Sequence, residues 1–411
     1  MDQTRIGELR EAGNLWSFAY NVDWQASPDA FTLSPSLPLA EGEIVDGASQ
    51  RPVQWFFDNL LPEEGARTLL AQDAGVDSAD AFGLLQRYGP ESAGALTLLT
   101  PGEALPTGGL SPLSDEALSA RIRNLPRVPL SHDAPKRMSV AGAQHKLAVV
   151  LDHGELFEPQ GRTASTHILK PDHLQPDHYA HSTINEWFVM RLAAAVGLPV
   201  PEVALRRVPE PVYLVKRFDR VGDGAQARRR HVLDACQLLS LDKAFKYQQA
   251  TAETLRELAE LCRTRALTRQ AIFRWSVFNL FIGNGDAHLK NLSFFPDAKG
   301  VAIAPHYDLI GTSIYRDGAW GQAELVTPMG NAIRFGDVCR DDVHRFGEAL
   351  GIPRAVSDRL LGEIRGKVNR LALALLEACE HDKELALLPG EARLLRQLVH
   401  GHMRDISQQL S

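Results

Sequence analysis

Hydrophobic residues follow strand spacing and helix spacing in different parts of the chain. Short alternating or continuous apolar runs predict strands at 15–20, 31–33, 93–99, 147–151, 166–171 and 212–220. Helical spacing predicts helices at 81–88, 115–122, 251–263, 269–282, 340–350, 357–379 and 391–408. A further helix begins at 183, and Gly197 and Pro199 mark its end. Strands dominate the first half and helices the second, which predicts an α+β fold.

Composition and pattern divide the chain into four parts. Residues 1–110 are predicted to form a small mixed α/β domain in which nothing is arranged for chemistry, so a structural or partner-binding role is favoured. Residues 111–135 predict a linker or connecting segment, because this region is rich in Pro, Gly and Ser. Residues 136–216 carry most of the remaining predicted strands, and residues 217–411 are mainly helical.

The segment 278–311 carries the strongest chemical signal. An apolar helix ends in a glycine-containing turn, and Asp286 follows, with Asn291 five residues later and Asp308 beyond a short predicted hairpin. Protein kinases use this order: the first aspartate orients the attacking hydroxyl, and the asparagine and second aspartate hold Mg²⁺. The alternative is a polar turn between a buried helix and two strands.

Elements that a kinase needs upstream of that segment are present in the expected order. The small residues of 139–146 precede a strand and could offer backbone N–H groups to phosphates, although a simple hairpin turn is the alternative. Lys170 lies on a short strand and suits the α/β-phosphates, or it is a surface lysine. Glu186 suits a helix glutamate that pairs with this lysine, or it completes a capping box with Thr183. The strand at 212–220 is the candidate hinge. The order predicts a two-lobed, protein-kinase-like fold.

Charge and cysteine usage exclude several other classes. The 411 residues contain 44 basic and 51 acidic side chains, and the net charge of −7 argues against whole-chain affinity for nucleic acid or anionic membranes. The four cysteines form no C-x-x-C pair, so neither zinc nor a disulfide framework is expected. No run reaches membrane-spanning length and no signal-peptide core is present, which favours a reducing cytoplasm. The basic run 228–230 is expected to be a solvated loop.

Several stretches of the chain are similar to one known family. They are WFFDNLLPEEGAR at 55–67, GPESAGALTLL at 89–99, SVAGAQHK at 139–146, THILKP at 166–171, NEWFVMRLAAAVGLPVP at 185–201, KRFDR at 216–220, DACQLL at 234–239, GNGDAHLKN at 283–291 and PHYDLIGTS at 305–313. They resemble the HipA family, the serine/threonine-kinase toxins of HipBA-type toxin–antitoxin modules. The resemblance covers nearly the whole chain. It implies a kinase-like fold with a small N-terminal domain and a largely helical C-lobe.

The resemblance implies a role for each matching residue in a site for ATP and Mg²⁺. Asp286 would be the catalytic base, Asn291 and Asp308 would hold Mg²⁺, and Lys170 would bind the α/β-phosphates with Glu186 as its candidate ion-pair partner. The remaining nucleotide-site residues would come from the phosphate loop, the hinge and the catalytic loop: Val140, Ala141, Gly142, Ala143, Gln144, His145, Lys146, Val215, Lys216, Arg217, Phe218, His288 and Lys290.

The resemblance also implies regulation and partners. Ser139 stands where members of the family are autophosphorylated, and a phosphate there adds nearly two negative charges beside ATP, which implies self-inactivation. The implied partners are a HipB-like DNA-binding antitoxin, operator DNA contacted mainly through the antitoxin complex, and a protein substrate such as an aminoacyl-tRNA synthetase. No membrane partner is implied.

Two other readings compete with an active kinase toxin. One is an inactive kinase fold that acts as a co-repressor with a DNA-binding antitoxin, but the joint presence of Lys170 with the two aspartates and the asparagine argues against it. The other is a metal-dependent hydrolase with Asp286, His288, His306 and Asp308 as ligands. That reading lacks a water-activating base and leaves the lysine unexplained.

Overall fold

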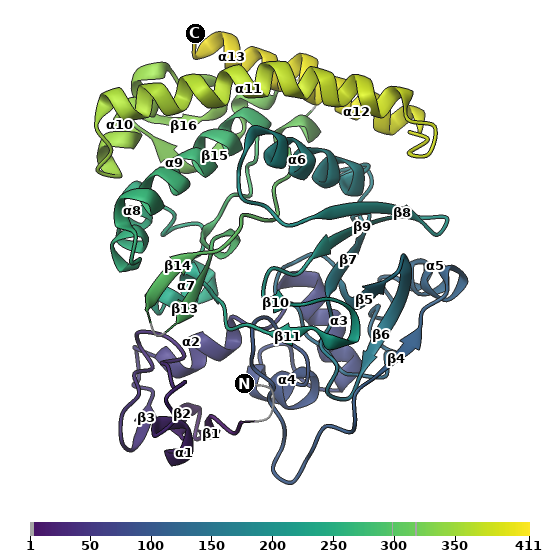
Figure 1. Ribbon diagram of the computed structural model, residues 1–411, viewed down its shortest axis with the longest axis vertical. Coiled ribbons are helices and arrows are strands. Elements are labelled where there is room, and N and C mark those ends of the chain that lie inside the picture. The colour runs from purple at the N-terminus through teal and green to yellow at the C-terminus, as the bar shows by residue number, and fades with distance from the viewer. Residues whose placement is uncertain (1–3, 298, 317–318) are drawn as a thin grey trace. The chain divides into compact units, whose positions relative to one another are not determined.

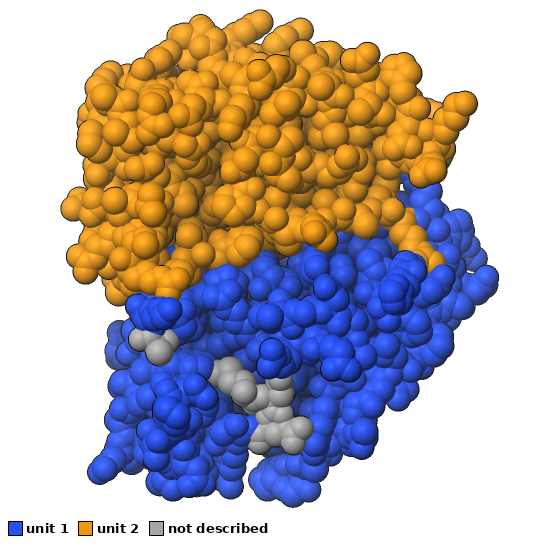
Figure 2. Space-filling model, viewed as in Figure 1, with its two compact units in different colours: residues 1–171, 207–245, 293–301 blue, residues 172–206, 246–292, 302–411 orange. Residues whose placement is uncertain are grey.

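The computed structural model describes residues 4–297, 299–316 and 319–411. The chain forms two compact units, which Figure 2 colours separately. The first unit is built from residues 1–171, 207–245 and 293–301, and the second from residues 172–206, 246–292 and 302–411. Each unit therefore collects segments that are distant in the sequence.

The N-terminal part of the first unit is a small antiparallel sheet followed by short helices. Its elements are β1 (Gly7–Ala12), β2 (Leu15–Tyr20), α1 (Val22–Gln25), β3 (Glu43–Val45), α2 (Pro52–Asp58), α3 (Glu64–Ala74) and α4 (Ala81–Tyr88), with strand order β1-β2-β3. In β2 the alternate residues Trp16, Phe18 and Tyr20 are buried, which explains the strand-period pattern of the sequence. The Asp80 side chain caps α4 by accepting a hydrogen bond from the Gly83 N–H at 2.8 Å.

A larger antiparallel sheet forms the middle of the first unit. Five of its strands belong to this unit in the order β4-β6-β5-β7-β9: β4 (Gly109–Pro112), β5 (Leu147–Asp152), β6 (Glu155–Gln160), β7 (His167–Pro171) and β9 (Pro211–Lys216). Strand β5 lies between two neighbours and its first four residues are buried, which explains its uninterrupted apolar run. Strands β7 and β9 pair in a register that sets Lys170 opposite Tyr213.

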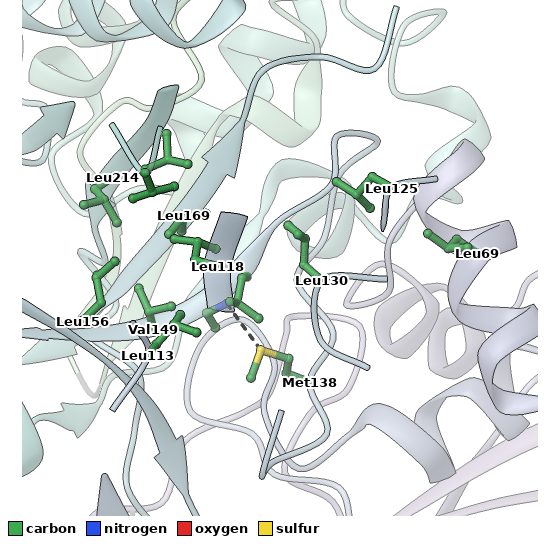
Figure 3. Close-up of a cluster of buried hydrophobic side chains, with 14 residues drawn as sticks. Leu69, Leu113, Leu118, Leu125, Leu130, Met138, Val149, Leu156, Leu169 and Leu214 are labelled. Atoms are coloured by element: carbon green, nitrogen blue, oxygen red, sulfur yellow. Dashed lines mark hydrogen bonds between the residues drawn. The ribbon is translucent and has the colours of Figure 1, made fainter. Parts of the chain in front are cut away.

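A buried hydrophobic cluster fills the space beside this sheet (Figure 3). Leu118 of α5 (Asp115–Asn124) packs in it with Val149 of β5 and Leu169 of β7. Met138 belongs to the same cluster, and its sulfur accepts a hydrogen bond from the Ala148 N–H at 3.3 Å. Burying a side chain of this size stabilises the fold by about 1.5–3 kcal/mol. The residue directly before Ser139 is therefore fixed in the core.

The remaining elements of the first unit are short. They are β10 (Arg220–Val221), η1 (Gly224–Gln226), β11 (Arg228–Arg229), β12 (Leu233–Asp234), α7 (Ala235–Leu239), η2 (Lys243–Phe245), β13 (Ser293–Asp297) and the start of β14 (Gly300–Ile303). Strand β12 pairs with β13, so that Leu233 lies opposite Phe294. Strands β10 and β11 pair with Arg220 opposite Arg229.

The second unit is mainly helical. Its helices are α6 (Ser182–Val196), α8 (Ala252–Leu261), α9 (Arg265–Ile282), α10 (Arg340–Ala349), α11 (Arg354–His381), α12 (Pro389–Gln397), the π-helix η7 (Leu398–Met403) and α13 (Arg404–Gln409). The long helix α11 packs against α6, α9 and α10, as Figure 1 shows. Helix α9 is almost fully buried over its last three turns, which accounts for its apolar sequence on all sides.

The second unit also contains short non-helical elements. These are most of β8 (Val203–Arg207), the hairpin of β15 (Glu324–Met329) and β16 (Ala332–Arg334), and the 3₁₀ turns η3 (Leu289–Asn291), η4 (Ser313–Tyr315), η5 (Trp320–Gln322) and η6 (Phe335–Asp337). Over the described ranges, no helix combines the length and the apolar character needed to cross a membrane.

Two predicted strands are wrong, and the backbone hydrogen bonds explain why. Residues 31–33 form no strand, because the Leu33 N–H donates to the Tyr20 hydroxyl at 2.8 Å instead of to a neighbouring strand. Residues 93–99 form no strand because Gly94 adopts a left-handed φ of 71° and its N–H donates to the Asp219 side chain at 2.7 Å. In each segment a backbone N–H is satisfied by a side chain, which an apolar run does not reveal.

Two helix details also differ from the sequence predictions. The capping box at Thr183 is absent: His181 is the N-cap of α6, and the Thr183 hydroxyl donates to Asp172 at 2.8 Å. The helix expected over 391–408 is interrupted by the π-helix η7, so it consists of three consecutive pieces. Single-turn π segments are frequent at functional sites.

Candidate active site

Asp286 lies in a loop that begins at the end of α9. Gly283 ends this helix with a left-handed φ of 67°, and the Asn284 side chain donates to Asn279 at 2.9 Å. The side-chain oxygen of Asn284 then accepts a hydrogen bond from the Asp286 N–H at 2.9 Å. Asp286 is thus positioned by side-chain contacts to the loop backbone. We call residues 283–291 the catalytic loop.

Asn291 closes this loop onto Asp286. Its side-chain Nδ2 donates a hydrogen bond of 2.7 Å to the backbone carbonyl oxygen of Asp286. An asparagine amide has separate donor and acceptor ends, so this contact uses the nitrogen and leaves the oxygen for another ligand. The spacing of five residues seen in the sequence therefore corresponds to a direct contact.

Asp308 follows β14 and has an unusual backbone conformation. Its φ is 54°, in the left-handed region that residues other than glycine rarely adopt. Such conformations cost free energy and are concentrated at functional sites. Asn185 of α6 holds the residues that follow: its side chain donates to the Gly311 carbonyl at 2.9 Å and accepts from the Gly311 N–H at 3.0 Å.

The segment after Asp308 also supports the catalytic loop directly. The Thr312 hydroxyl accepts a hydrogen bond from the Gly285 N–H at 2.7 Å. The Ser313 N–H donates to the Gly283 carbonyl at 2.9 Å. Asp286, Asn291 and the 308–313 segment are therefore parts of one hydrogen-bonded arrangement within the second unit.

His402 of the π-helix lies beneath this arrangement. Its Nε2 is 3.0 Å from the Leu280 carbonyl, to which it donates, and its Nδ1 is 3.2 Å from the Ser313 hydroxyl, from which it accepts. Burial lowers the pKa of His402 to about 4, so the imidazole is neutral and can fill both roles. Nothing in the sequence of α9 or of the catalytic loop indicates that a residue as distant in the chain as His402 contacts this region.

Two further residues of the catalytic loop were predicted as site residues. The His288 ring is buried and lies edge-on to the Tyr247 ring, with centroids 4.9 Å apart. Lys290 is also buried, and its backbone carbonyl accepts a hydrogen bond from the Tyr307 hydroxyl at 2.6 Å. Tyr247 itself donates to Asp286 Oδ1 at 2.5 Å, a contact that the sequence did not predict.

The predicted phosphate loop, residues 139–146, lies in the first unit and is held at several points. Ser139 is buried, and its N–H donates to the Glu91 carbonyl at 2.8 Å. Gly142 has a φ of 111°, and its carbonyl accepts from the Glu63 N–H at 3.1 Å. Glu63 and Glu91 come from the N-terminal 110 residues, so this region takes part in holding the loop. The Lys146 ammonium donates to the Ala141 carbonyl at 2.7 Å, inside the loop.

The strand lysine and the helix glutamate lie in different units. Lys170 of β7 is buried, with its Nζ 5.6 Å from the centre of the Tyr213 ring. Gln144 of the predicted loop donates to the Pro171 carbonyl at 3.0 Å, which ties the loop to the residue after the lysine. Glu186 is buried on α6. The pairing of Lys170 with Glu186 stays a prediction.

The candidate hinge directs its side chains into the first unit. Val215 is buried in β9, Lys216 pairs with Asp223 at 2.9 Å, and the Phe218 ring meets Phe295 edge-on with centroids 5.9 Å apart. The Arg217 guanidinium is buried in a cluster of charges. Any nucleotide contact at Arg217 would therefore come from its backbone.

The cluster around Glu91 consists of two buried carboxylates and four buried cations. Glu91 accepts hydrogen bonds from Lys136 at 2.6 Å, from Arg220 at 2.9 Å and from Arg229. Asp219 pairs with Arg217 at 2.7 Å and with Arg220 at 3.0 Å. We call these residues the Glu91 cluster. The expectation that the basic run at 228–230 is a solvated loop is wrong for Arg229.

The charges of this cluster depend strongly on one another. Burial alone would raise the pKa of Glu91, but the neighbouring cations, Arg229 first, lower it well below its usual range. Burial lowers the pKa of Lys136 to about 8, against the opposing effect of Glu91. Nothing in the stretch GPESAGAL indicates that Glu91 has this role.

The metal-dependent hydrolase reading finds no support in this geometry. His306 is buried with its ring stacked near Trp275, and burial lowers its pKa to about 4. Among residues 4–297, 299–316 and 319–411, no three His, Cys, Asp or Glu side chains are grouped so as to hold a metal ion.

Comparisons with known proteins agree with this arrangement. The HipA N-terminal domain model matches residues 1–99, and the HipA-like C-terminal domain model matches residues 138–372. The serine/threonine-protein kinase toxin HipA of Shewanella oneidensis is 32% identical over 393 residues, which covers 90% of this chain and 86% of that protein. Y4mE of Sinorhizobium fredii, whose name classes it with the kinases, is 37% identical over 404 residues, covering 92% of this chain and 93% of that protein.

A solved structure is similar over almost the full length. HipA of Shewanella oneidensis, in its complex with HipB and operator DNA, superposes with a TM-score of 0.78 at 28% identity and covers 98% of this chain and 97% of that chain. The predicted α+β, kinase-like fold is thereby confirmed. The chain belongs to the HipA family and is an enzyme of the serine/threonine-kinase class.

Proposed function

We propose that this chain is an ATP- and Mg²⁺-dependent protein serine/threonine kinase whose catalytic residue is Asp286. The observation that carries the proposal is the 2.7 Å contact from the Asn291 amide to the Asp286 carbonyl. It sets a carboxylate and an amide oxygen at fixed positions in one loop. Phosphoryl transfer needs this combination, because the attacking hydroxyl and the cation must be positioned together.

The donor atoms of the second unit suit Mg²⁺. Asn291 retains its side-chain oxygen, and Asp308 would supply a carboxylate from its left-handed backbone conformation, three residues before the Gly311 backbone that Asn185 holds. Magnesium prefers oxygen ligands and is usually bound by one or two carboxylates together with substrate phosphates. Bound Mg²⁺ with ATP would supply the transferable phosphoryl group and neutralise the charge that develops on it.

Each group of site residues would then have its own role in phosphoryl transfer. Asp286 would accept the proton of the acceptor hydroxyl, and Lys170 and the 139–146 backbone would bind phosphate oxygens. The backbone of Val215–Phe218 would border the adenine. His288 and Lys290, both buried, would keep the catalytic loop rigid. The N-terminal region would contribute indirectly, by holding the phosphate loop through Glu63 and Glu91.

We further propose that this kinase is the toxin of a type II toxin–antitoxin pair and acts in the cytoplasm. The similarity to HipA in its complex with HipB and operator DNA supports a HipB-like DNA-binding antitoxin as the partner, with operator DNA approached mainly through that partner. The substrate would be a protein of translation, such as an aminoacyl-tRNA synthetase, whose phosphorylation arrests growth.

Ser139 would provide an off-switch through its own phosphorylation. Its side chain is buried and its N–H is bonded to Glu91, so the loop must leave this position before Ser139 can react. A phosphate adds nearly two negative charges, which could not return to a buried place beside ATP. Phosphorylation at Ser139 would therefore keep the phosphate loop displaced and stop the kinase.

The test is incubation of the purified protein with γ-labelled ATP and Mg²⁺, followed by mapping of the label. Wild type should label itself at Ser139, and Asp286→Asn should lose about 10²–10⁴-fold in rate, the usual effect of removing a general base. Asp337→Asn, an exposed aspartate of the same unit, should behave as wild type. Equal labelling by Asp286→Asn and wild type would contradict the catalytic assignment. Tight Mg·ATP binding without any transfer would instead favour an inactive co-repressor.

A further inference from the structure

Tyr247 contacts the carboxylate that we assign as the catalytic base. Its phenol oxygen lies 2.5 Å from Asp286 Oδ1, and a phenol donates while a carboxylate accepts. The Tyr247 side chain comes from an irregular segment that lies before α8, and the residue is 44% exposed. The contact therefore joins the candidate base to a residue that solvent and other molecules can reach.

Neighbouring residues hold Tyr247 on one side. The Leu289 N–H of the catalytic loop donates to the Lys246 carbonyl at 3.2 Å. The His288 ring meets the Tyr247 ring at 81° with centroids 4.9 Å apart. These contacts keep the phenol near Asp286, while the exposed side of the ring leaves room for it to swing away.

The phenol has the same hydrogen-bonding group as the expected acceptor. A serine or threonine that attacks the phosphoryl group must first place its O–H against Asp286, so that the proton can pass to the carboxylate. Tyr247 already presents an O–H at Oδ1 of that carboxylate. Water could bind there too, and a water molecule oriented by Asp286 would hydrolyse the nucleotide without using a protein acceptor.

We propose that Tyr247 occupies the acceptor position on Asp286 until a protein substrate displaces it, and so selects protein hydroxyls over water. This inference rests on the proposed kinase function. In the productive step, the acceptor oxygen bonds to the γ-phosphorus of ATP, the bond from that phosphorus to the ADP oxygen breaks, and the acceptor proton passes to Asp286. With water as acceptor, the same step yields ADP and inorganic phosphate.

A role as a fixed support for Asp286 would give the opposite kinetic result. If the phenol only oriented the carboxylate, then removing its oxygen would lower every transfer rate. If it competes with the acceptor, removing the oxygen frees Asp286 for water. Tyr247→Phe separates the two, because it retains the ring packed on His288 and deletes only the hydroxyl.

The kinetic test measures ATP hydrolysis in the absence of a protein acceptor. Tyr247→Phe should hydrolyse ATP about tenfold to a hundredfold faster than wild type, since one hydrogen bond to a charged group is lost. Tyr179→Phe is the matched control, because Tyr179 is a comparably exposed tyrosine of the same unit, at 38%, and it should leave the rate unchanged. A rate equal to or below that of wild type in Tyr247→Phe would overturn the proposal.

A second readout needs no nucleotide. The chain has seven tyrosines, so ¹³Cζ-tyrosine labelling gives a short NMR spectrum in which Tyr247→Phe identifies the Tyr247 signal. That signal should move in Asp286→Ala and stay in place in Asp337→Ala, because only the former removes the acceptor of the phenol hydrogen bond. If the Tyr247 signal stays in place in Asp286→Ala, the hydrogen bond from Tyr247 to Asp286 is absent in solution, and this result would also overturn the proposal.

Self-phosphorylation and ATP hydrolysis, measured side by side, separate failure of this inference from failure of the proposed function. If wild type transfers phosphate to itself but Tyr247→Phe gains no hydrolysis, only the inference falls. If neither protein transfers or hydrolyses phosphate in the presence of Mg²⁺, the kinase proposal falls and this inference falls with it.

Discussion

The Asn291 side chain donates through its nitrogen to the Asp286 backbone carbonyl at 2.7 Å, while its oxygen is left for other partners. The two ends of one amide therefore serve two purposes. The nitrogen fixes the shape of the loop that carries the catalytic residue, and the oxygen is available to a cation. These purposes can be separated by substitution, since aspartate keeps the oxygen and lacks the donor.

We expect Asn291→Asp to retain Mg·ATP binding and to lose transfer. Two oxygens would face each other where the nitrogen now meets the Asp286 carbonyl, so the loop must shift, and a shift of about 1 Å in a reacting group costs roughly 10²-fold in rate. Asn291→Ala should lose both properties. Titration with Mg·ATP and label-transfer rates measure the two effects. Transfer by Asn291→Asp at the wild-type rate would show that the amide donor is unimportant.

His402 should affect catalysis without touching a substrate. We expect His402→Phe to fill a similar volume beside the Trp320 and Phe335 rings but to leave the Leu280 carbonyl and the Ser313 hydroxyl without this partner. The loss should lower the free energy of unfolding by about 1–3 kcal/mol. It should also lower kcat more than it raises KM for ATP, because the catalytic loop loses its support. His400→Phe, an exposed change in the same π-helix, is the control for both measurements. A normal kcat in a destabilised protein would limit His402 to a purely structural role.

Glu91 should be far more important for stability than an exposed acidic residue. Glu91→Gln removes a buried counter-charge from Lys136, Arg220 and Arg229, and breaking a buried ion pair from one side costs about 3–5 kcal/mol. Glu103→Gln removes the charge from a more exposed pair with Arg137 but keeps an amide oxygen that can accept from Thr100, so it should cost about 0–1 kcal/mol. Urea unfolding of the two variants beside wild type measures the difference. Similar losses of unfolding free energy in both variants would show that the charge of Glu91 stabilises the fold no more than an exposed charge does.

Buried histidines should make the protein sensitive to mild acid. Burial lowers the pKa values of four histidines to about 4, namely His167, His231, His306 and His402. In the unfolded chain these groups bind protons from about pH 6.5 downward, whereas in the folded chain they stay neutral until about pH 4. Their effect on stability is therefore absent above about pH 6.5, grows as the pH falls towards 4, and then levels off.

The expected size of this acid effect can be measured. Between pH 7.5 and 5.5 each histidine should lower the free energy of unfolding by about 1 kcal/mol, so the four together give several kcal/mol. His306→Phe removes a group that lies against Trp275 and should reduce the pH dependence by about a quarter. Urea titrations at the two pH values test this. An unchanged pH dependence in His306→Phe would show that this histidine binds protons equally in the folded and unfolded states, so that burial does not lower its pKa.

The sequence was most informative where the partners of a residue lie close by in the chain. The helix α9, the turn at Gly283 and the pair Asp286 and Asn291 all fall within 27 consecutive residues. Periodicity predicted the helix and the turn, and the spacing predicted that the two residues face the same side, although not the hydrogen bond between them. Strands β5 and β7 were predicted for the same reason, because a buried strand needs only a short apolar run.

The sequence did not indicate the roles of residues whose hydrogen-bond partners are far away in the chain. Asn185 meets Gly311, and His402 meets Leu280 and Ser313, so their roles depend on the packing of α6 and of the π-helix against the loop. Helical spacing did predict α6, but the order of kinase elements pointed to Glu186 and not to its neighbour Asn185. Residues 183–186 match the capping-box motif with Thr183 as the N-cap, yet α6 begins at Ser182 and its N-cap is His181.

The Glu91 cluster has a consequence for how such proteins are inherited. Glu91 belongs to the stretch matched by the HipA N-terminal domain, whereas Arg217, Arg220 and Arg229 belong to the stretch matched by the C-terminal domain. A recombination event that exchanged one stretch between two distant relatives would bring together charges that had never been selected as a set. We therefore expect the two stretches to be transmitted between genomes as one piece, and hybrids joined between them to fold only when both parents carry matching charges.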